Sequence, residues 1–273
     1  MGGKYTININ TEMNYGRPRS PNVSETAELL FSIIRDISVT GAHTARVMYE
    51  ARGWFTHHNT DLGAPLHPST SAGTCVWPTG GAWLSTHLWN TTFSPATKNS
   101  SLTFTRSSKA RRSSSDTLVP EPKHGWLVTN PSHSPEHAGR FRRRPDDGPR
   151  IVRVVFNQAA KSSEILGTDA EFRTQVLAAR AKLAPFQIGK FGQLQEWLDD
   201  RDKEKDAHRH PSHLYLLYPS ALITPETPNS SPPRKKPLDG RGLQSTGWAW
   251  RGASTSGPAR STAKTRTKSS SSS

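Results

Sequence analysis

The stretch IVRVVFNQAAKSSEIL (residues 151–166), followed by Gly167 and TDAEFRTQVLAARAKL (residues 168–183), decides the fold class. Both segments repeat apolar residues at helical spacing, which is typical of helices that bury one face. Gly167 is expected to end the first helix, and Thr168 with Glu171 to form a capping box for the next. The residues expected on the buried side of the first helix are Ile151, Val152, Val155, Phe156, Ala159 and Ala160. The sequence therefore predicts two antiparallel helices and a mainly α fold.

Further helices are predicted in the first part of the chain. Ser24 has the character of an N-cap, and an apolar pattern of helical spacing follows it until Gly41, which we expect to end that helix. Another helix is expected over residues 42–51, and a third after Trp77. Residues 4–15 instead alternate apolar and polar side chains, which predicts a short N-terminal strand.

Asn8 and Asn10 would share one face of that strand. Two neighbouring carboxamides offer paired donors and acceptors, which suit a sugar hydroxyl or a positioned water molecule. The alternative is that both side chains face solvent at the edge of a sheet.

Composition divides the chain into ordered and disordered parts. Hydrophobic residues make up 32%, Gly and Pro number 20 and 21, and the net charge is +14, a mixture that favours partial disorder. The basic charge is concentrated in segments rich in Ser, Arg and Pro, which carry few aromatic residues, so no specific nucleic-acid partner is expected. We expect order in residues 1–90 and 122–224, a low-complexity disordered segment at 91–121, and a basic disordered tail at 225–273.

The sequence does not indicate a disulfide, a membrane span, a signal region or a metal site. Cys75 is the only cysteine, and no apolar run reaches the length of about 18 residues that a membrane span needs. The N-terminus shows no apolar signal region, and the localisation and oligomeric state stay open. The cluster His57-His58-Asn59-Thr60-Asp61 raises the question of zinc, but its spacing does not fit a zinc motif, so no metal and no cofactor are expected.

The segment WLVTNPSHSPEH (residues 126–137) predicts a strand that ends in an ordered loop, because each Pro disfavours helix in the residue before it. This loop carries Glu136 between a proline and histidines. Desolvation there would keep the carboxyl protonated near neutral pH, as a general acid requires. The alternative is an ordinary solvated glutamate.

Together with two further blocks, QIGKFGQLQEW (187–197) and HRHPSHLY (208–215), these segments make the chain resemble the α-L-fucosidases of glycoside hydrolase family 95. The resemblance implies a partial (α/α)6 barrel. It also implies inverting hydrolysis of a terminal α-1,2-linked L-fucose, with a fucosylated oligosaccharide or glycan as the partner.

The resemblance also implies roles for individual residues. Glu136 becomes the general acid, and Asn8 and Asn10 hold the attacking water. The residues implied for the sugar pocket are His58, Trp77, Glu196, His208, His210 and His213. The family supplies a water-activating aspartate in a downstream Gln-Ile-Asp-Gly-Asn-Phe-Gly motif, which this sequence does not contain.

The departures from the family pattern coincide with the basic segments. After Tyr15, for example, Gly16-Arg17-Pro18-Arg19 stands where the family continues with Trp-Pro. Our hypothesis is an incomplete catalytic domain with frameshifted or mis-spliced segments, inactive as a hydrolase. The alternative function is a non-catalytic carbohydrate-binding remnant or a basic interaction protein.

Overall fold

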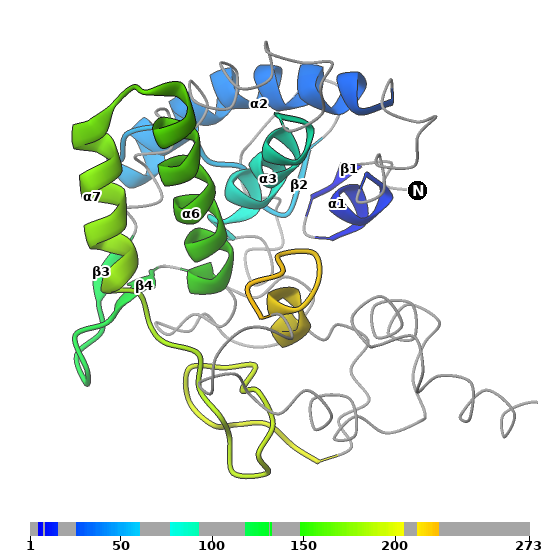
Figure 1. The fold of residues 1–273 in the computed structure, drawn as a ribbon. Helices are drawn as coiled ribbons and strands as arrows, with labels where there is room; N and C mark the ends of the chain where they lie inside the picture. The colour runs from blue at the N-terminus through cyan, green and yellow to red at the C-terminus, as the bar shows by residue number, and fades with distance from the viewer. Residues whose placement is uncertain are drawn as a thin grey trace, which may run out of the picture. The chain divides into compact units, whose positions relative to one another are not determined.

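The computed structural model describes residues 5–7, 9–15, 26–60, 77–92, 118–130, 132, 148–204 and 212–223. The chain divides into two compact units, residues 1–184 and residues 185–273, and each is described by itself. Unit 1 contains most of the regular structure, as the ribbon in Figure 1 shows. The predicted mainly α character is confirmed, because the described part is rich in helix and its strands are two or three residues long.

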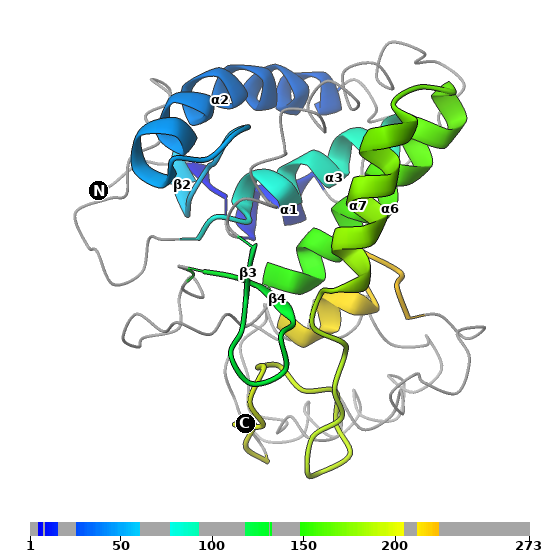
Figure 2. The same ribbon diagram turned by 90° about the vertical axis from the view of Figure 1, so that its left-hand side faces the viewer.

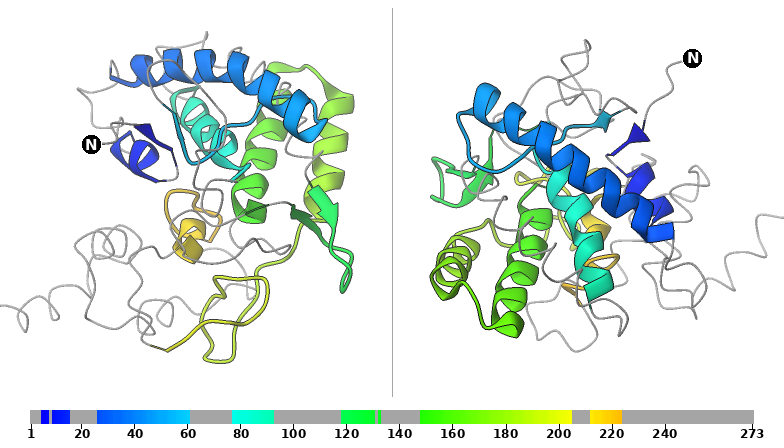
Figure 3. Two further views of the ribbon diagram at one scale, coloured as in Figure 1. Left: turned by 180° about the vertical axis from the view of Figure 1, so that it is seen from behind. Right: turned by 90° about the horizontal axis from the view of Figure 1, so that it is seen from above.

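The described residues of unit 1 form four longer helices and one short one. They are α1 (Asn10–Asn14), α2 (Thr26–Tyr49), α3 (Gly80–Thr92), α6 (Gly148–Leu166) and α7 (Ala170–Ala181). Helix α3 contacts both α2 and α6, and α6 packs along α7 (Figures 1 and 2). Seen from above, α2 passes over α3 at an angle (Figure 3). These helices form pairs, and a closed barrel is not part of the described structure.

The α6–α7 pair confirms the helices predicted from the opening stretch. All six residues expected on the inner side of α6 are buried. Val152 and Phe156 of α6 form one apolar cluster with Val176 of α7, Leu183 and Leu118. This interface fixes α7 against α6, since helices of this length depend mainly on packing for stability.

The predicted capping box at Thr168 is wrong. Gly167 has a φ of +61°, and the Thr168 amide donates to the Ser163 carbonyl at 3.1 Å. The Gly167 amide donates to the Glu164 carbonyl at 3.2 Å, which completes the Schellman arrangement that closes α6. Because Thr168 takes part in that closure, Asp169 precedes α7 instead, and its side chain makes no capping hydrogen bond.

The predicted break at Gly41 is also wrong, because α2 continues through it to Tyr49. Gly41 is buried, and its carbonyl accepts a hydrogen bond from the Phe55 amide at 3.1 Å. Ala45, one turn later, is fully buried. A glycine inside a helix costs about 1 kcal/mol relative to alanine, and the burial of this part of α2 offsets that cost.

The N-terminal strand is shorter than predicted. Strand β1 (Tyr5–Thr6) pairs antiparallel with β2 (Asn59–Thr60), and the Ile7 amide extends the ladder by donating to the His58 carbonyl at 2.8 Å. The chain then turns into α1, where the Thr11 hydroxyl donates back to the Thr6 carbonyl at 2.8 Å. The prediction that Asn10 lies on a strand is therefore wrong, and Asn8 lies outside the described residues.

A β-hairpin leads into the α6–α7 pair. Strand β3 (Leu118–Pro120) pairs antiparallel with β4 (Leu127–Thr129), and β4 confirms the strand predicted there. Strand β3 lies at the end of the range in which we expected no regular structure. The Leu127 amide donates to the Lys182 carbonyl at 2.8 Å, so the hairpin is attached to the end of α7.

Unit 2 holds a turn-rich loop and the short 3-10 helix η1 (Ser212–Leu216). The predicted glycine turn is present, because the Gly189 amide donates to the Gln193 carbonyl at 2.8 Å. Leu194, Leu216 and Ile223 form the apolar cluster of this unit. Among the described residues of the whole chain, no helix combines the length and apolar character that a membrane span needs.

Candidate functional site

One group of candidate residues lies in unit 1, where β1, β2 and the start of α3 meet. His57 is 2% exposed, and its Nδ1 accepts the Trp77 amide at 3.4 Å. Its Nε2 lies 3.3 Å from the Tyr49 hydroxyl. Because an amide can only donate, Nδ1 is the acceptor, and the ring proton belongs on Nε2, which donates to Tyr49.

Burial sets the charge of this group. Desolvation lowers the pKa of His57 to about 4 and raises the pKa of Tyr49 to about 12. Both side chains are therefore neutral near pH 7, and both ring nitrogens of His57 are engaged within the protein. His57 consequently serves to join α2 to the segment that starts α3, and it is not free for a ligand.

Two residues predicted for the sugar pocket, His58 and Trp77, belong to this region. His58 is half-buried and directly precedes β2. Trp77 is 0% exposed and packs edge-on to Trp83 with 6.0 Å between ring centroids. Its indole Nε1 has no hydrogen-bond partner in the described structure, nor has the buried Thr79 hydroxyl. Trp77 is therefore part of the packed interior of unit 1 in the described structure.

The first turn of α3 packs too closely for larger residues. A Cβ at Gly80 would lie 2.8 Å from the Thr56 carbonyl oxygen, and one at Gly81 would lie 2.6 Å from the Trp54 ring. The two glycines following Trp77 therefore allow α3 to approach the segment that carries His57. This contact explains why the first turn of α3 begins with a Gly-Gly pair.

Glu12 is a buried acid that the sequence reasoning missed. It lies on α1, is 3% exposed, and neither carboxyl oxygen has a hydrogen-bond partner in the described structure. Burial raises the pKa of Glu12 well above its ordinary value, and its own backbone amide opposes this only in part. Positions two apart on a helix do not face each other, so Glu12 points away from Asn10. In a strand, by contrast, residues 10 and 12 would lie on the same face, so the strand predicted for residues 4–15 does not indicate that Glu12 differs from Asn10.

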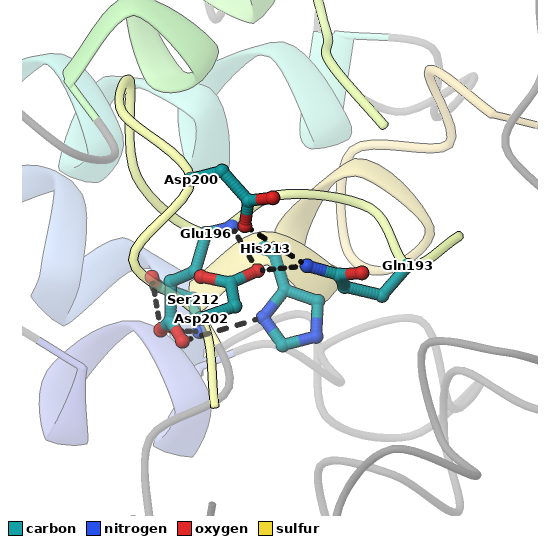
Figure 4. Close-up of polar contacts among 6 residues, drawn as sticks. All are labelled: Gln193, Glu196, Asp200, Asp202, Ser212 and His213. Carbon is teal, nitrogen blue, oxygen red and sulfur yellow. Dashed lines mark hydrogen bonds and ion pairs between the residues drawn. The ribbon is translucent and has the colours of Figure 1, made fainter. Parts of the chain in front are cut away.

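The other group of candidate residues lies in unit 2, and its polar contacts are shown in Figure 4. Glu196 is 4% exposed, and its Oε1 accepts the Ser212 hydroxyl at 2.7 Å and the Ser212 amide at 3.0 Å. Its Oε2 lies 3.6 Å from Nδ1 of His213, which is 5% exposed. The structure thus brings together Glu196 and His213, which were predicted from two separate sequence blocks.

A network of loop carboxylates holds Glu196 in place. Asp202 accepts the Glu196 amide at 3.2 Å and the Gln193 side-chain amide at 3.0 Å. Asp200 accepts the Lys190 amide at 2.6 Å. A Cβ at Gly189 would overlap the end of the Gln193 side chain, which would then have to move. The sequence showed these acids only as a charged patch.

Four predicted site residues lie outside the described residues, namely Asn8, Glu136, His208 and His210. The distance between the proposed general acid and the proposed water-binding asparagines is therefore not defined. Asn10, His58 and Trp77 fall in unit 1, and Glu196 and His213 in unit 2. Within the described ranges, no three His, Cys, Asp or Glu side chains are arranged to hold a metal ion.

Comparison with known protein families identifies the family of this chain. Residues 2–269 match the model of the glycosyl hydrolase family 95 catalytic domain, so the chain belongs to this family. This result confirms the resemblance drawn from the sequence blocks.

The curated relatives are α-fucosidases by name. The chain is similar to Alpha-L-fucosidase 2 of Arabidopsis thaliana, with 33% identity over 90% of this chain and 31% of the relative. It is also similar to Probable alpha-fucosidase A of Aspergillus niger, with 27% identity over 81% of this chain and 29% of the relative. The same-named protein of Aspergillus oryzae is 24% identical over 80% of this chain and 23% of the relative. The chain thus spans less than a third of the length of each.

Proposed function

We propose that this chain is an α-L-fucosidase-type glycoside hydrolase domain whose ligand is a glycan ending in an α-1,2-linked L-fucose. The observation that carries the proposal is the family match over residues 2–269, supported by relatives that are named α-fucosidases. Residues 1–90 and 122–224 are then two parts of a partial (α/α)6 barrel. The packed helices of unit 1 are consistent with part of such a barrel.

In the proposed chemistry, Glu136 protonates the glycosidic oxygen while Asn8 and Asn10 hold the attacking water on the opposite face of the sugar. An inverting enzyme keeps its two catalytic groups roughly 6.5–9.5 Å apart, which leaves room for that water. Attack from the opposite face inverts the anomeric centre. The residues proposed to contact the sugar are His58, Trp77, Glu196, His208, His210 and His213.

We also propose that turnover by these 273 residues is at background level. A carboxamide has no basic lone pair at neutral pH, so Asn8 and Asn10 cannot take the proton of the water. General base catalysis commonly contributes about 10²–10⁴-fold, and the sequence lacks the family motif that carries the base. The second candidate function is carbohydrate binding without hydrolysis. It follows from the same absence of the aspartate that would activate the water.

Incubation of the purified chain with a 2′-fucosylated oligosaccharide, followed by assay of free fucose, tests both statements. We expect no fucose above the blank, and the same result for Glu136→Gln. Fucose release that Glu136→Gln abolishes would support a hydrolase and contradict the proposed inactivity. Calorimetric titration with the same oligosaccharide tests binding separately, and a failure to bind would contradict both functions.

A further inference from the structure

The Glu196 carboxylate uses both of its oxygens inside the protein. Its Oε1 accepts two hydrogen bonds from Ser212, at 2.7 Å from the hydroxyl and 3.0 Å from the amide. Its Oε2 faces the His213 ring at 3.6 Å. The carboxylate is also almost fully buried. Glu196 is therefore oriented toward helix η1, which begins at Ser212.

From this geometry we infer that Glu196 is a positioning residue, which fixes the start of η1 and holds the His213 ring with its proton on Nδ1. The inference deepens the proposed function and rests on it for the identity of the ligand. It changes the role of Glu196 from a residue of the sugar pocket wall to one that acts through His213. The nitrogen left to contact a ligand is Nε2 of His213.

The physical reason is the charge that faces Nδ1. In a neutral imidazole, one nitrogen carries the proton and the other a lone pair, and the partner of one nitrogen decides the state of the other. A carboxylate attracts an N–H group and repels a lone pair. At 3.6 Å the contact is longer than a hydrogen bond, so the interaction is mainly electrostatic. The favoured tautomer therefore has an acceptor at Nε2, which suits a sugar hydroxyl.

The Ser212 contacts make Glu196→Gln a sharp test. The two Ser212 groups that face Oε1 include a backbone amide, which can only donate, so the glutamine must keep its oxygen on that side. Its NH₂ group then faces Nδ1 of His213. A donor at that position favours a lone pair on Nδ1 and a proton on Nε2. The substitution should therefore invert the tautomer and keep the bonds that hold η1.

The experiment is ¹⁵N NMR of the full chain labelled at histidine, with His213→Gln used to assign the His213 signals. In the wild-type neutral ring we expect the Nε2 signal at the acceptor position and the Nδ1 signal at the N–H position. In Glu196→Gln the two signals should exchange character. Ser212→Ala, which keeps the carboxylate, and Asp199→Asn, which removes a half-buried carboxylate paired with Arg201, should leave the wild-type tautomer unchanged.

Two results would overturn the inference. One is a wild-type ring with its proton on Nε2, a result that does not depend on whether Glu196→Gln folds. The other is a folded Glu196→Gln protein with the wild-type tautomer. Adding L-fucose tests the proposed function separately. A fucose-dependent shift of the His213 Nε2 signal is expected, and its absence would count against the sugar site while the tautomer result stands.

Discussion

Replacing Glu12 by glutamine should stabilise the protein at neutral pH. The Glu12 carboxyl is 3% exposed and has no hydrogen-bond partner in the described structure, and burial raises its pKa well above 4.5. In the unfolded chain the same carboxyl ionises near its ordinary pKa. Between the two pKa values the folded state holds a proton that the unfolded state has released, so stability falls as pH rises.

The magnitude follows from proton linkage. Across that pH window, each pH unit costs the wild-type protein about 1.4 kcal/mol of unfolding free energy. Glutamine has nearly the shape of the protonated acid and cannot ionise. The difference between Glu12→Gln and wild type should therefore grow by about 1.4 kcal/mol per pH unit above the ordinary glutamate pKa, and level off above the raised pKa.

The assay is urea unfolding of both proteins at a series of pH values, with Glu28→Gln on the exposed side of α2 as the control. The control should change the unfolding free energy by less than about 0.5 kcal/mol throughout. A Glu12→Gln protein that matches wild type at every pH, or that is less stable at neutral pH, would refute a buried protonated Glu12.

Three further predictions follow from the packing and the titration of unit 1. His87→Asn should reduce the loss of stability on acidification, because burial lowers the pKa of His87 to about 4. Between pH 6.5 and about 4 the unfolded chain therefore takes up a proton that the folded protein does not. Urea unfolding across that pH range measures the effect, and an unchanged dependence of the unfolding free energy on pH would contradict the prediction. Gly81→Ala should destabilise by about 1–3 kcal/mol, since the new Cβ would lie 2.6 Å from the Trp54 ring, and an unaltered midpoint would show that the ring moves freely. Phe156→Ala should cost about 3–5 kcal/mol, against less than about 1 kcal/mol for the exposed Leu177→Ala, and equal costs would place Phe156 outside the core.

The sequence predicted the helices whose apolar pattern is long and regular. Residues 151–166 form α6 with the expected side buried, because helical spacing leaves one apolar face that must pack. The prediction of a helix end at Gly41 failed, because a tertiary contact decides where α2 ends. At Gly41 the helix α2 continues, and the Gly41 carbonyl accepts a hydrogen bond from the Phe55 amide, 14 residues away in the sequence. The sequence around Gly41 does not report that contact. At Thr168 the error is local, because its amide closes α6 by donating to the Ser163 carbonyl, and Asp169 precedes α7 instead.

Similar reasons limit what the sequence could tell about the site. Glu196 and His213 were both singled out, but 17 positions separate them in the sequence, and no helical or strand periodicity links the two. Glu12 was overlooked because its segment alternates like a strand, and the turn into α1 depends on the bond between Thr11 and Thr6. Its burial follows from that turn.

The most direct test of the account is a calorimetric titration of the purified 273-residue chain with a 2′-fucosylated oligosaccharide and with the same oligosaccharide lacking fucose. Free fucose is measured in the same samples. We expect binding of the fucosylated form only, with no fucose released. Equal affinity for the two oligosaccharides, or no binding of either, would contradict the central claim that this chain is a fucose-specific domain.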